Sequence, residues 1–237
     1  MEETSDRAKR AAAEAAVDLV EDGMALGLGT GSTAAHFVEL LAGRIRADGL
    51  RLFCVPTSLT TAAQASSLEI PLVTLDDVKS LDLTIDGADE ADGALDLIKG
   101  AGGALLREKI VAAASSRMVV IADASKRVET LGAFPLSVEI VRFGAPATLE
   151  QIDAVLSEAD VDGRRVTHRQ GDNGRFITDE GHEIVDLHLG RIGDASALSQ
   201  ALLAIPGVVE TGLFIGMATE LMLGAADGSV ERVTRGD

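Results

Sequence analysis

Apolar positions in the first half of the chain recur with two different spacings that alternate along the sequence. Helical spacing occupies residues 7–21, 32–47, 60–68 and 102–116, and short apolar runs occupy residues 24–29, 51–58, 71–75, 81–86, 94–100 and 117–123. Short runs of this kind predict buried strands, and the amphipathic stretches between them predict helices. The pattern therefore predicts a Rossmann-like α/β unit, a parallel sheet with helices on both faces.

The spacing changes beyond about residue 133. Residues 135–143, 164–169 and 176–189 alternate apolar and polar positions, and helical spacing returns near 148–158 and 194–204. This pattern predicts a small antiparallel sheet with two helices, a ferredoxin-like α+β arrangement. Residues 207–216 and a final hairpin ending at 230–235 are predicted to return to the first sheet. We therefore expect an α/β catalytic domain at 1–133 with 212–237, and a smaller domain at 134–211.

Length and charge restrict the class of protein. The 237 residues carry 21 Lys and Arg against 38 Asp and Glu, a formal charge of −17. Nucleic acid and anionic membranes are repelled by such a charge, so neither is an expected partner. No apolar run reaches the roughly 18 residues needed to cross a bilayer, and the first residues lack a signal peptide. We expect a cytoplasmic protein.

The acidic composition has two interpretations. The acids are spread along the whole chain and only five of the 21 cations are lysines, a pattern also found in proteins of salt-loving organisms. An ordinary acidic cytosolic enzyme fits equally well, and composition leaves the choice open. An anionic substrate would need local positive potential on such a molecule, so the lysines are candidates for function.

Cysteine and histidine do not indicate a catalytic thiol or a metal site. The single cysteine, Cys54, lies in an apolar run without a neighbouring base, which predicts an inert buried thiol. The four histidines are spread along the chain, outside metal-ligand spacings. We expect neither a metal nor a cofactor.

Residues 27–33, with the sequence GLGTGST, lie between a predicted strand and a predicted helix. Glycines let the backbone approach an anion, and the N–H groups and positive end of the helix attract it. A dinucleotide site would need a third glycine at Ser32, and a Walker loop would need a lysine. The loop therefore favours a single phosphate on a small molecule, with Thr30, Ser32 and Thr33 as hydroxyl donors. The alternative is a plain strand-to-helix turn.

Acids and lysines follow several predicted strands of the first sheet. Asp86 and Asp89 end one strand in IDGADE, and Lys99 follows in IKGAGG. Glu108 opens a helix in LLREKI, and Lys126 follows another strand in ADASK. Open parallel sheets bind ligands at the carboxyl ends of their strands. Taken singly each residue could be a solvated surface charge, but together they have the groups needed to move protons next to a carbonyl.

Four segments, TGSTAAHF, TIDGADE, IKGAGGALLREKI and IADASK, resemble the type A ribose 5-phosphate isomerases in order and spacing. AIPGVVETGLF, nearer the C-terminus, is also similar to this family. The resemblance implies cofactor-free interconversion of ribose 5-phosphate and ribulose 5-phosphate in the pentose phosphate pathway. It also implies a sugar phosphate as ligand and a homodimer or homotetramer.

The resemblance assigns roles to individual residues. It implies Glu108 as the catalytic base and Lys9 as a residue near the phosphate. Substrate binding is carried over to Thr30, Gly31, Ser32 and Thr33, to Asp86, Gly87, Ala88 and Asp89, to Lys99, Gly100, Ala101 and Gly102, and to Lys126. The family usually has three glycines after the lysine, so the methyl group of Ala101 is expected to tighten the pocket.

The expected mechanism is proton transfer through a cis-enediolate. Glu108 removes the proton from C2 and returns it at C1, Lys99 stabilises the developing oxyanion, and Asp86 or Asp89 moves hydroxyl protons. Alternatives are a sugar-phosphate deaminase or lactonase, a phosphosugar-binding regulator, and an acyl-CoA transferase. A histidine near the acids would favour the first, but none lies between His36 and His168. The second needs a DNA-binding module, and the third would form a covalent glutamyl adduct.

Overall fold

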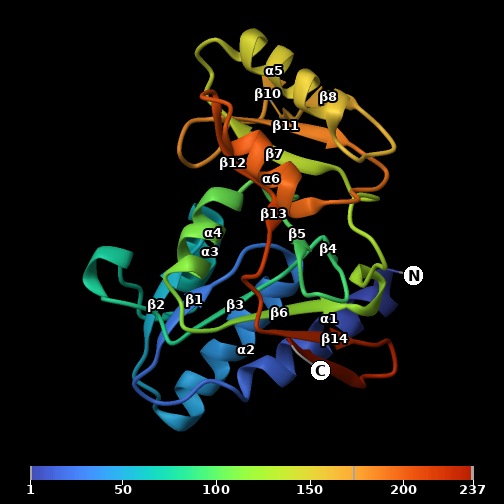
Figure 1. Cartoon of the computed structure of the whole chain (residues 1–237). Coiled ribbons are helices and arrows are strands. Elements are labelled where there is room, and N and C mark those ends of the chain that lie inside the picture. The colour runs from blue at the N-terminus through green and yellow to red at the C-terminus, as the bar shows by residue number, and fades with distance from the viewer. Residues whose placement is uncertain (1, 173, 236–237) are drawn as a thin grey trace. The chain divides into compact units, whose positions relative to one another are not determined.

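The computed structural model describes residues 2–172 and 174–235, and the chain in it forms two compact units (Figure 1). The first unit comprises the chain up to Ala88, Arg107–Lys126 and the chain from Met217 onward. The second unit comprises Asp89–Leu106 and Arg127–Gly216. The domain boundaries expected from the sequence stay a prediction. None of the described helices is long and apolar enough to cross a membrane.

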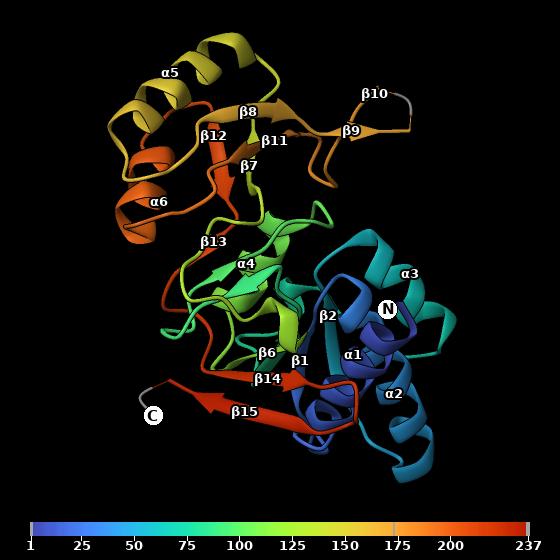
Figure 2. The same cartoon turned by 90° about the vertical axis from the view of Figure 1, so that its right-hand side faces the viewer.

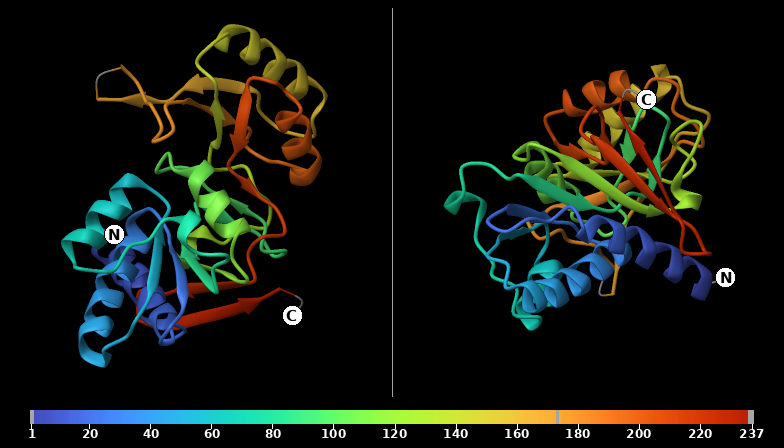
Figure 3. Two further views of the ribbon diagram at one scale, coloured as in Figure 1. Left: turned by 90° about the vertical axis from the view of Figure 1, so that its left-hand side faces the viewer. Right: turned by 90° about the horizontal axis from the view of Figure 1, so that it is seen from below.

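The first unit contains a six-stranded sheet with the strand order β15-β14-β6-β3-β1-β2. Its strands are β1 (Ala25–Leu28), β2 (Phe53–Pro56), β3 (Leu83–Asp86), β6 (Met118–Asp123), β14 (Glu220–Gly224) and β15 (Val230–Thr234). All neighbours pair in parallel except β14 and β15, which form the antiparallel hairpin at the red end of the chain (Figure 3). The parallel sheet and the returning hairpin expected from the sequence are both confirmed.

Helices cover both faces of this sheet. They are α1 (Glu2–Val17), α2 (Ser32–Asp48), α3 (Leu59–Ser67) and α4 (Leu105–Ala113), and the short 3-10 turns η1 (Leu75–Asp77) and η2 (Ala124–Lys126) complete the elements. Adjacent strand residues point to opposite faces. Leu26 packs in the main core with α1, α2 and α3, whereas Val55 packs with Val111 of α4. Figure 2 shows α1 and α2 lying together against the sheet.

The second unit is built on a four-stranded antiparallel sheet, in the order β12-β7-β11-β8. Its elements are β7 (Leu136–Ile140), α5 (Ala145–Glu158), β8 (Arg165–His168), β11 (Glu183–His188), α6 (Ala195–Leu203) and β12 (Val208–Thr211). Smaller pairings join β4 (Glu90–Ala91), β5 (Leu97–Ile98) and β13 (Leu213–Phe214), and β9 (Gln170–Gly171) with β10 (Gly174–Arg175). The antiparallel sheet with two helices agrees with the sequence pattern.

The two faces of the four-stranded sheet differ in polarity. Val138 and Val185 pack with Ile152 of α5 and Leu202 of α6 in one apolar core, and Figure 2 shows both helices on the same face. Ser137 and Asp186 lie directly opposite each other in the β7–β11 register. Because side chains alternate along a strand, this pair faces away from α5 and α6. The second face of the sheet is therefore polar.

Two short elements differ from the sequence-based expectation. Residues 71–75 do not form the expected strand, since only Leu72 bridges to Cys54 of β2. The chain turns away because the Asp77 carboxylate accepts hydrogen bonds from the Thr74 N–H and hydroxyl. The acidic segment after β3, which has no strand pattern in the sequence, contains the two-residue strand β4. Glu90 of β4 is buried and accepts the N–H groups of Gly132 and Phe134.

The expectation that residues 207–216 return to the first sheet is wrong. β12 pairs with β7, and β13 pairs with β5, so the segment belongs to the second unit. Gly212, between the two strands, accepts the Lys99 N–H at 2.9 Å, and a Cβ atom there would lie 2.2 Å from the Lys99 carbonyl oxygen. The apolar pattern predicts strands here, but it does not specify their partners.

Candidate active site

The amino end of α2 is open to solvent and directly follows β1. Gly31 has a φ of 109°, a conformation that L side chains rarely adopt, and as the N-cap residue it has no side chain to cap the first turn of the helix. Gly31 and Ser32 are exposed. The free N–H groups of a helix start carry partial positive charge and bind anions. This end of α2 is therefore suited to a phosphate.

The carboxylate of Asp86, at the end of β3, holds the loop that leads into α2. Its Oδ1 atom accepts the N–H of Thr30 at 3.0 Å and the N–H of Gly87 at 2.7 Å. A Cβ atom at Gly29 would lie 2.3 Å from the same oxygen, so only glycine fits there. Asp86 is fully buried. The ends of two neighbouring strands are thus tied together by one carboxylate.

A buried cluster of hydroxyl groups supports the loop from its other side. Thr30 Oγ1 lies 2.7 Å from Thr57 Oγ1, 2.8 Å from Ser58 Oγ and 3.1 Å from Thr61 Oγ1. Thr61 also donates to the Gly29 carbonyl at 2.9 Å. Sequence reasoning assigned no role to Thr57, Ser58 and Thr61; the signal was a run of hydroxyl residues at the end of a predicted strand. The Thr30 hydroxyl is engaged in fixing the loop.

Lys9 places a positive charge at the amino end of α2. Its Nζ atom donates to Ser32 Oγ at 3.0 Å, from a half-buried position on α1. Helices α1 and α2 pack against each other in the first unit. On a chain with a charge of −17, an ammonium group here supplies the local positive potential that a phosphate needs.

Glu108 lies in the first turn of α4, and its side chain is buried with 4% exposure. A carboxylate at a helix start is favoured by the helix dipole. A buried acid is also a candidate for proton transfer. Lys126, at the end of η2 after β6, is half-buried. Of the site residues predicted from the sequence, the first unit holds Thr30–Thr33, Asp86–Ala88, Glu108 and Lys126.

The second unit holds the remaining predicted residues, Asp89 and Lys99–Gly102. Lys99 follows β5, is 2% exposed, and its ammonium nitrogen lies 5.5 Å from the centre of the Phe214 ring. Asp89 Oδ2 accepts the N–H of Ala101 at 3.0 Å. Asp89 thus fixes the turn that follows the lysine.

This turn explains where glycine is required and where it is not. Gly100 and Gly103 have φ angles of 117° and 76°, and their missing Cβ atoms would lie 2.8 Å from Ser137 and 2.4 Å from Phe176. Ala101 is not among the described residues with a positive φ, and it is exposed. The middle of the turn therefore accepts a methyl group without backbone strain.

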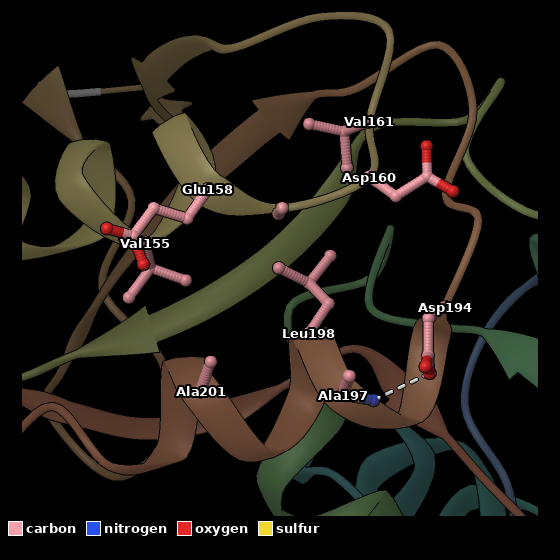
Figure 4. Close-up of a pocket in the computed structure, with 9 residues that line it drawn as sticks. Val155, Glu158, Asp160, Val161, Asp194, Ala197, Leu198 and Ala201 are labelled. Atoms are coloured by element: carbon pink, nitrogen blue, oxygen red, sulfur yellow. Dashed lines mark hydrogen bonds between the residues drawn. The ribbon is translucent and has the colours of Figure 1, made fainter.

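A hollow elsewhere in the second unit is a poor candidate for a phosphate site. A cavity of about 220 Å³ lies between α5 and α6 (Figure 4). Its lining residues are Val155, Glu158, Ala159, Asp160, Val161, Asp194, Ala197, Leu198 and Ala201. Asp194 accepts the Ala197 N–H at 2.8 Å and so caps α6. The charged lining residues are all acids, which repel an anion.

Burial makes Cys54 chemically inert. The side chain lies in the main core of the first unit, and its burial raises the pKa of the thiol to about 12. A thiolate is the nucleophilic form of cysteine. Within residues 2–172 and 174–235, no group of three or more His, Cys, Asp and Glu side chains is placed to hold a metal ion.

Comparison with known proteins agrees with the motifs. The family model described as ribose 5-phosphate isomerase A (phosphoriboisomerase A) matches residues 53–228. The chain is 58% identical to ribose-5-phosphate isomerase A of Methylorubrum extorquens, over 95% of each protein. It is 59% identical to the protein of the same name from Afipia carboxidovorans, again over 95% of each.

Solved structures resemble the chain over nearly its full length. Ribose 5-phosphate isomerase from Plasmodium falciparum has a TM-score of 0.92 and 36% identity, covering 98% of this chain and 100% of that one. A D-ribose-5-phosphate isomerase in complex with phospho-erythronic acid has a TM-score of 0.91 and 34% identity, covering 98% and 99% of the two chains.

The parallel sheet with its helices makes the first unit an α/β fold, and the relatives named ribose-5-phosphate isomerase A place the chain in the aldose–ketose isomerase class. The family model covers more than half of the chain, and the curated relatives cover nearly all of it. The chain belongs to the ribose 5-phosphate isomerase A family.

The buried thiol gives a direct prediction. Since the pKa of Cys54 is about 12, on the order of one molecule in ten thousand carries a thiolate at pH 8. The folded protein is expected to resist alkylation by iodoacetamide at this pH, and the protein unfolded in urea to react with one equivalent. Mass spectrometry after timed quenching measures both. Rapid labelling of the folded protein would contradict the burial of Cys54.

Proposed function

We propose that this chain interconverts D-ribose 5-phosphate and D-ribulose 5-phosphate through a cis-enediolate, with Glu108 as the base. The observation that carries the proposal is in the first unit. An uncapped helix start with Lys9 beside it occurs in the same compact unit as a buried glutamate on α4. The helix start with Lys9 suits the phosphate of a sugar, and the buried glutamate suits the transfer of a proton.

The phosphate is anchored first. The N–H groups at the start of α2, the Ser32 hydroxyl and the Lys9 ammonium are the donors for its oxygens. Fixing this remote group orients the opened sugar chain. Binding energy from the phosphate thus lowers the activation barrier for the proton transfer. A similar isomerase holds phospho-erythronic acid, which combines a phosphate with a carboxylate. We expect this chain to bind that compound with its phosphate at α2.

Glu108 then transfers the proton. Its carboxylate takes the proton from C2, and the electron pair of that bond forms the C1–C2 double bond while negative charge develops on the former aldehyde oxygen. Glu108 returns the proton to C1, and the proton of the C2 hydroxyl moves to the C1 oxyanion, which leaves a ketone at C2 and a hydroxyl at C1. Burial of Glu108 keeps water away from the carboxylate during this exchange.

Lys99 stabilises the oxyanion, and Asp86 or Asp89 moves the hydroxyl protons. A buried ammonium group interacts with a developing negative charge much more strongly than a solvated one does. Of the two acids, Asp86 is fully buried and accepts two backbone N–H groups. Asp89 is only half-buried, which favours it for exchange of protons with solvent and for assisting ring opening.

We also propose that the enzyme acts in the cytoplasm as a homodimer or homotetramer. The sequence resemblance to the family supports this assembly.

Replacing Glu108 with glutamine tests the base. The amide keeps the size of the side chain but does not accept a proton, so kcat is expected to fall by about 10²–10⁴-fold with little change in KM. Glu150→Gln, the same change on the exposed surface of α5, is the control and should keep wild-type kcat. Steady-state assays of purified, chelator-treated protein with ribose 5-phosphate give both constants. If Glu108→Gln retains most of its turnover, another group is the base.

Replacing Lys9 with methionine tests the phosphate anchor. Loss of one charge-assisted hydrogen bond is expected to raise KM for ribose 5-phosphate about 10-fold while kcat changes little, because the phosphate is bound equally in the ground and transition states. Lys79→Met removes an exposed lysine from the same unit and should leave KM unchanged. An unchanged KM in Lys9→Met would exclude Lys9 from the phosphate site.

A further inference from the structure

The polar face of the four-stranded sheet contains a charged network that no step of the proposed mechanism uses. Ser137 of β7 and Asp186 of β11 are paired in register, and Arg169 follows β8 on the other side of β11. The backbone N–H of Arg169 bonds to the Ile184 carbonyl at 2.9 Å, which continues the strand pairing. The guanidinium group is thereby brought over this polar face.

Every N–H of the Arg169 guanidinium has an acceptor. Nε donates to Asp186 Oδ2 at 3.0 Å, and Nη2 donates to Asp186 Oδ1 and to Ser137 Oγ. Nη1 donates to the carbonyl oxygens of Gly100 at 2.5 Å and Ala101 at 3.1 Å. A guanidinium has five N–H donors in a rigid fork, and this geometry uses all of them. The side chain is 14% exposed.

These contacts fix the turn that follows Lys99. The Gly100 carbonyl also accepts the Gly103 N–H at 3.0 Å, and the Ala101 N–H is held by Asp89. Phe176 fills the space beside Gly103, and the guanidinium carbon of Arg169 lies 6.0 Å from the centre of its ring. The turn is therefore held through its carbonyl groups by Arg169, through an N–H by Asp89, and from one side by Phe176.

We propose that Arg169 is a positioning residue for the isomerisation, which sets the conformation of the 100–103 turn and through it the placement of Lys99. This inference rests on the proposed role of Lys99 and residues 100–102 in substrate binding. A misplacement of about 1 Å in a catalytic group can lower turnover by about 10²-fold, so a tightly held turn matters for kcat. Lysine does not replace arginine here, because an ammonium group lacks the planar fork that reaches a carboxylate and two carbonyls together.

The main alternative is that Arg169 only neutralises Asp186. Two variants, both designed to fold, separate positioning of the 100–103 turn from neutralisation of Asp186. Arg169→Lys keeps a positive charge beside Asp186 but loses the bonds to the two carbonyls. The double variant Arg169→Met with Asp186→Leu removes both charges, which avoids leaving one of them without its partner. Arg191→Lys is the matched control, since Arg191 pairs with Asp160 and Asp162 at an exposed position in the same unit.

For each protein we would measure kcat and KM for ribose 5-phosphate, the inhibition constant of inorganic phosphate, and the melting temperature. Both Arg169 variants are expected to lose about 10- to 100-fold in kcat. The inhibition constant of inorganic phosphate should stay within about 2-fold of the wild-type value. The double variant should melt close to wild type and still be slow. Arg191→Lys should match wild-type kcat. A wild-type kcat in either Arg169 variant would overturn the inference. It would also be overturned if the double variant regained both the kcat and the melting temperature of the wild type.

A Lys99→Met variant separates failure of this inference from failure of the proposed function. If Lys99→Met is slow and the Arg169 variants turn over normally, only the role of Arg169 is wrong. If Lys99→Met keeps wild-type kcat, the proposed role of Lys99 is wrong, and the inference about Arg169 fails with it. Slow Arg169 variants beside a slow Lys99→Met support both.

Discussion

The hydrogen bonds from Thr30 and Gly87 to the buried carboxylate of Asp86 are the constraint on which the phosphate site depends. They join the ends of β1 and β3 and set the direction in which the chain enters α2. Gly29 is required because any side chain there would occupy the space of this carboxylate. Gly31, at the N-cap, has no side chain to cap the start of α2, which suits the N–H groups there to binding a ligand. Without the Asp86 contacts, the same glycines would form a mobile turn.

The same principle recurs in the second unit, where charged and polar side chains hold backbone groups near the predicted site residues. Asp89 holds the Ala101 N–H, and Arg169 holds the carbonyls of Gly100 and Ala101. In the first unit the hydroxyls of Thr57, Ser58 and Thr61 surround that of Thr30. The residues expected to contact the sugar phosphate thus depend on a layer of side chains behind them. Such a layer keeps donors and acceptors in place before the substrate arrives.

Much of the fold follows from local patterns in the sequence. Amphipathic spacing and short apolar runs predict the parallel sheet, its helices and the antiparallel sheet, because burial of one face decides each of these elements. Pairing between strands that lie far apart in the sequence is harder to predict. The apolar residues of β12 and β13 predict strands, yet their partners β7 and β5 lie far away in the sequence, and no local pattern names them. Glu90 and its two N–H donors lie more than forty residues apart, so no local pattern indicates that contact.

The candidate site shows the same division. Glycines, hydroxyls and acids at strand ends predict the phosphate loop and the acids, since their chemistry is visible in short motifs. Thr57 has only the weak signal of a hydroxyl run at a strand end, and Arg169 has no motif, because its role arises from contacts with chain segments far away in the sequence. A crystal structure of Glu108→Gln with ribose 5-phosphate tests the central claim most directly. The account predicts the phosphate at the start of α2, bonded to the N–H groups after Gly31 and to Lys9. A phosphate bound elsewhere, with this helix start empty, would contradict it.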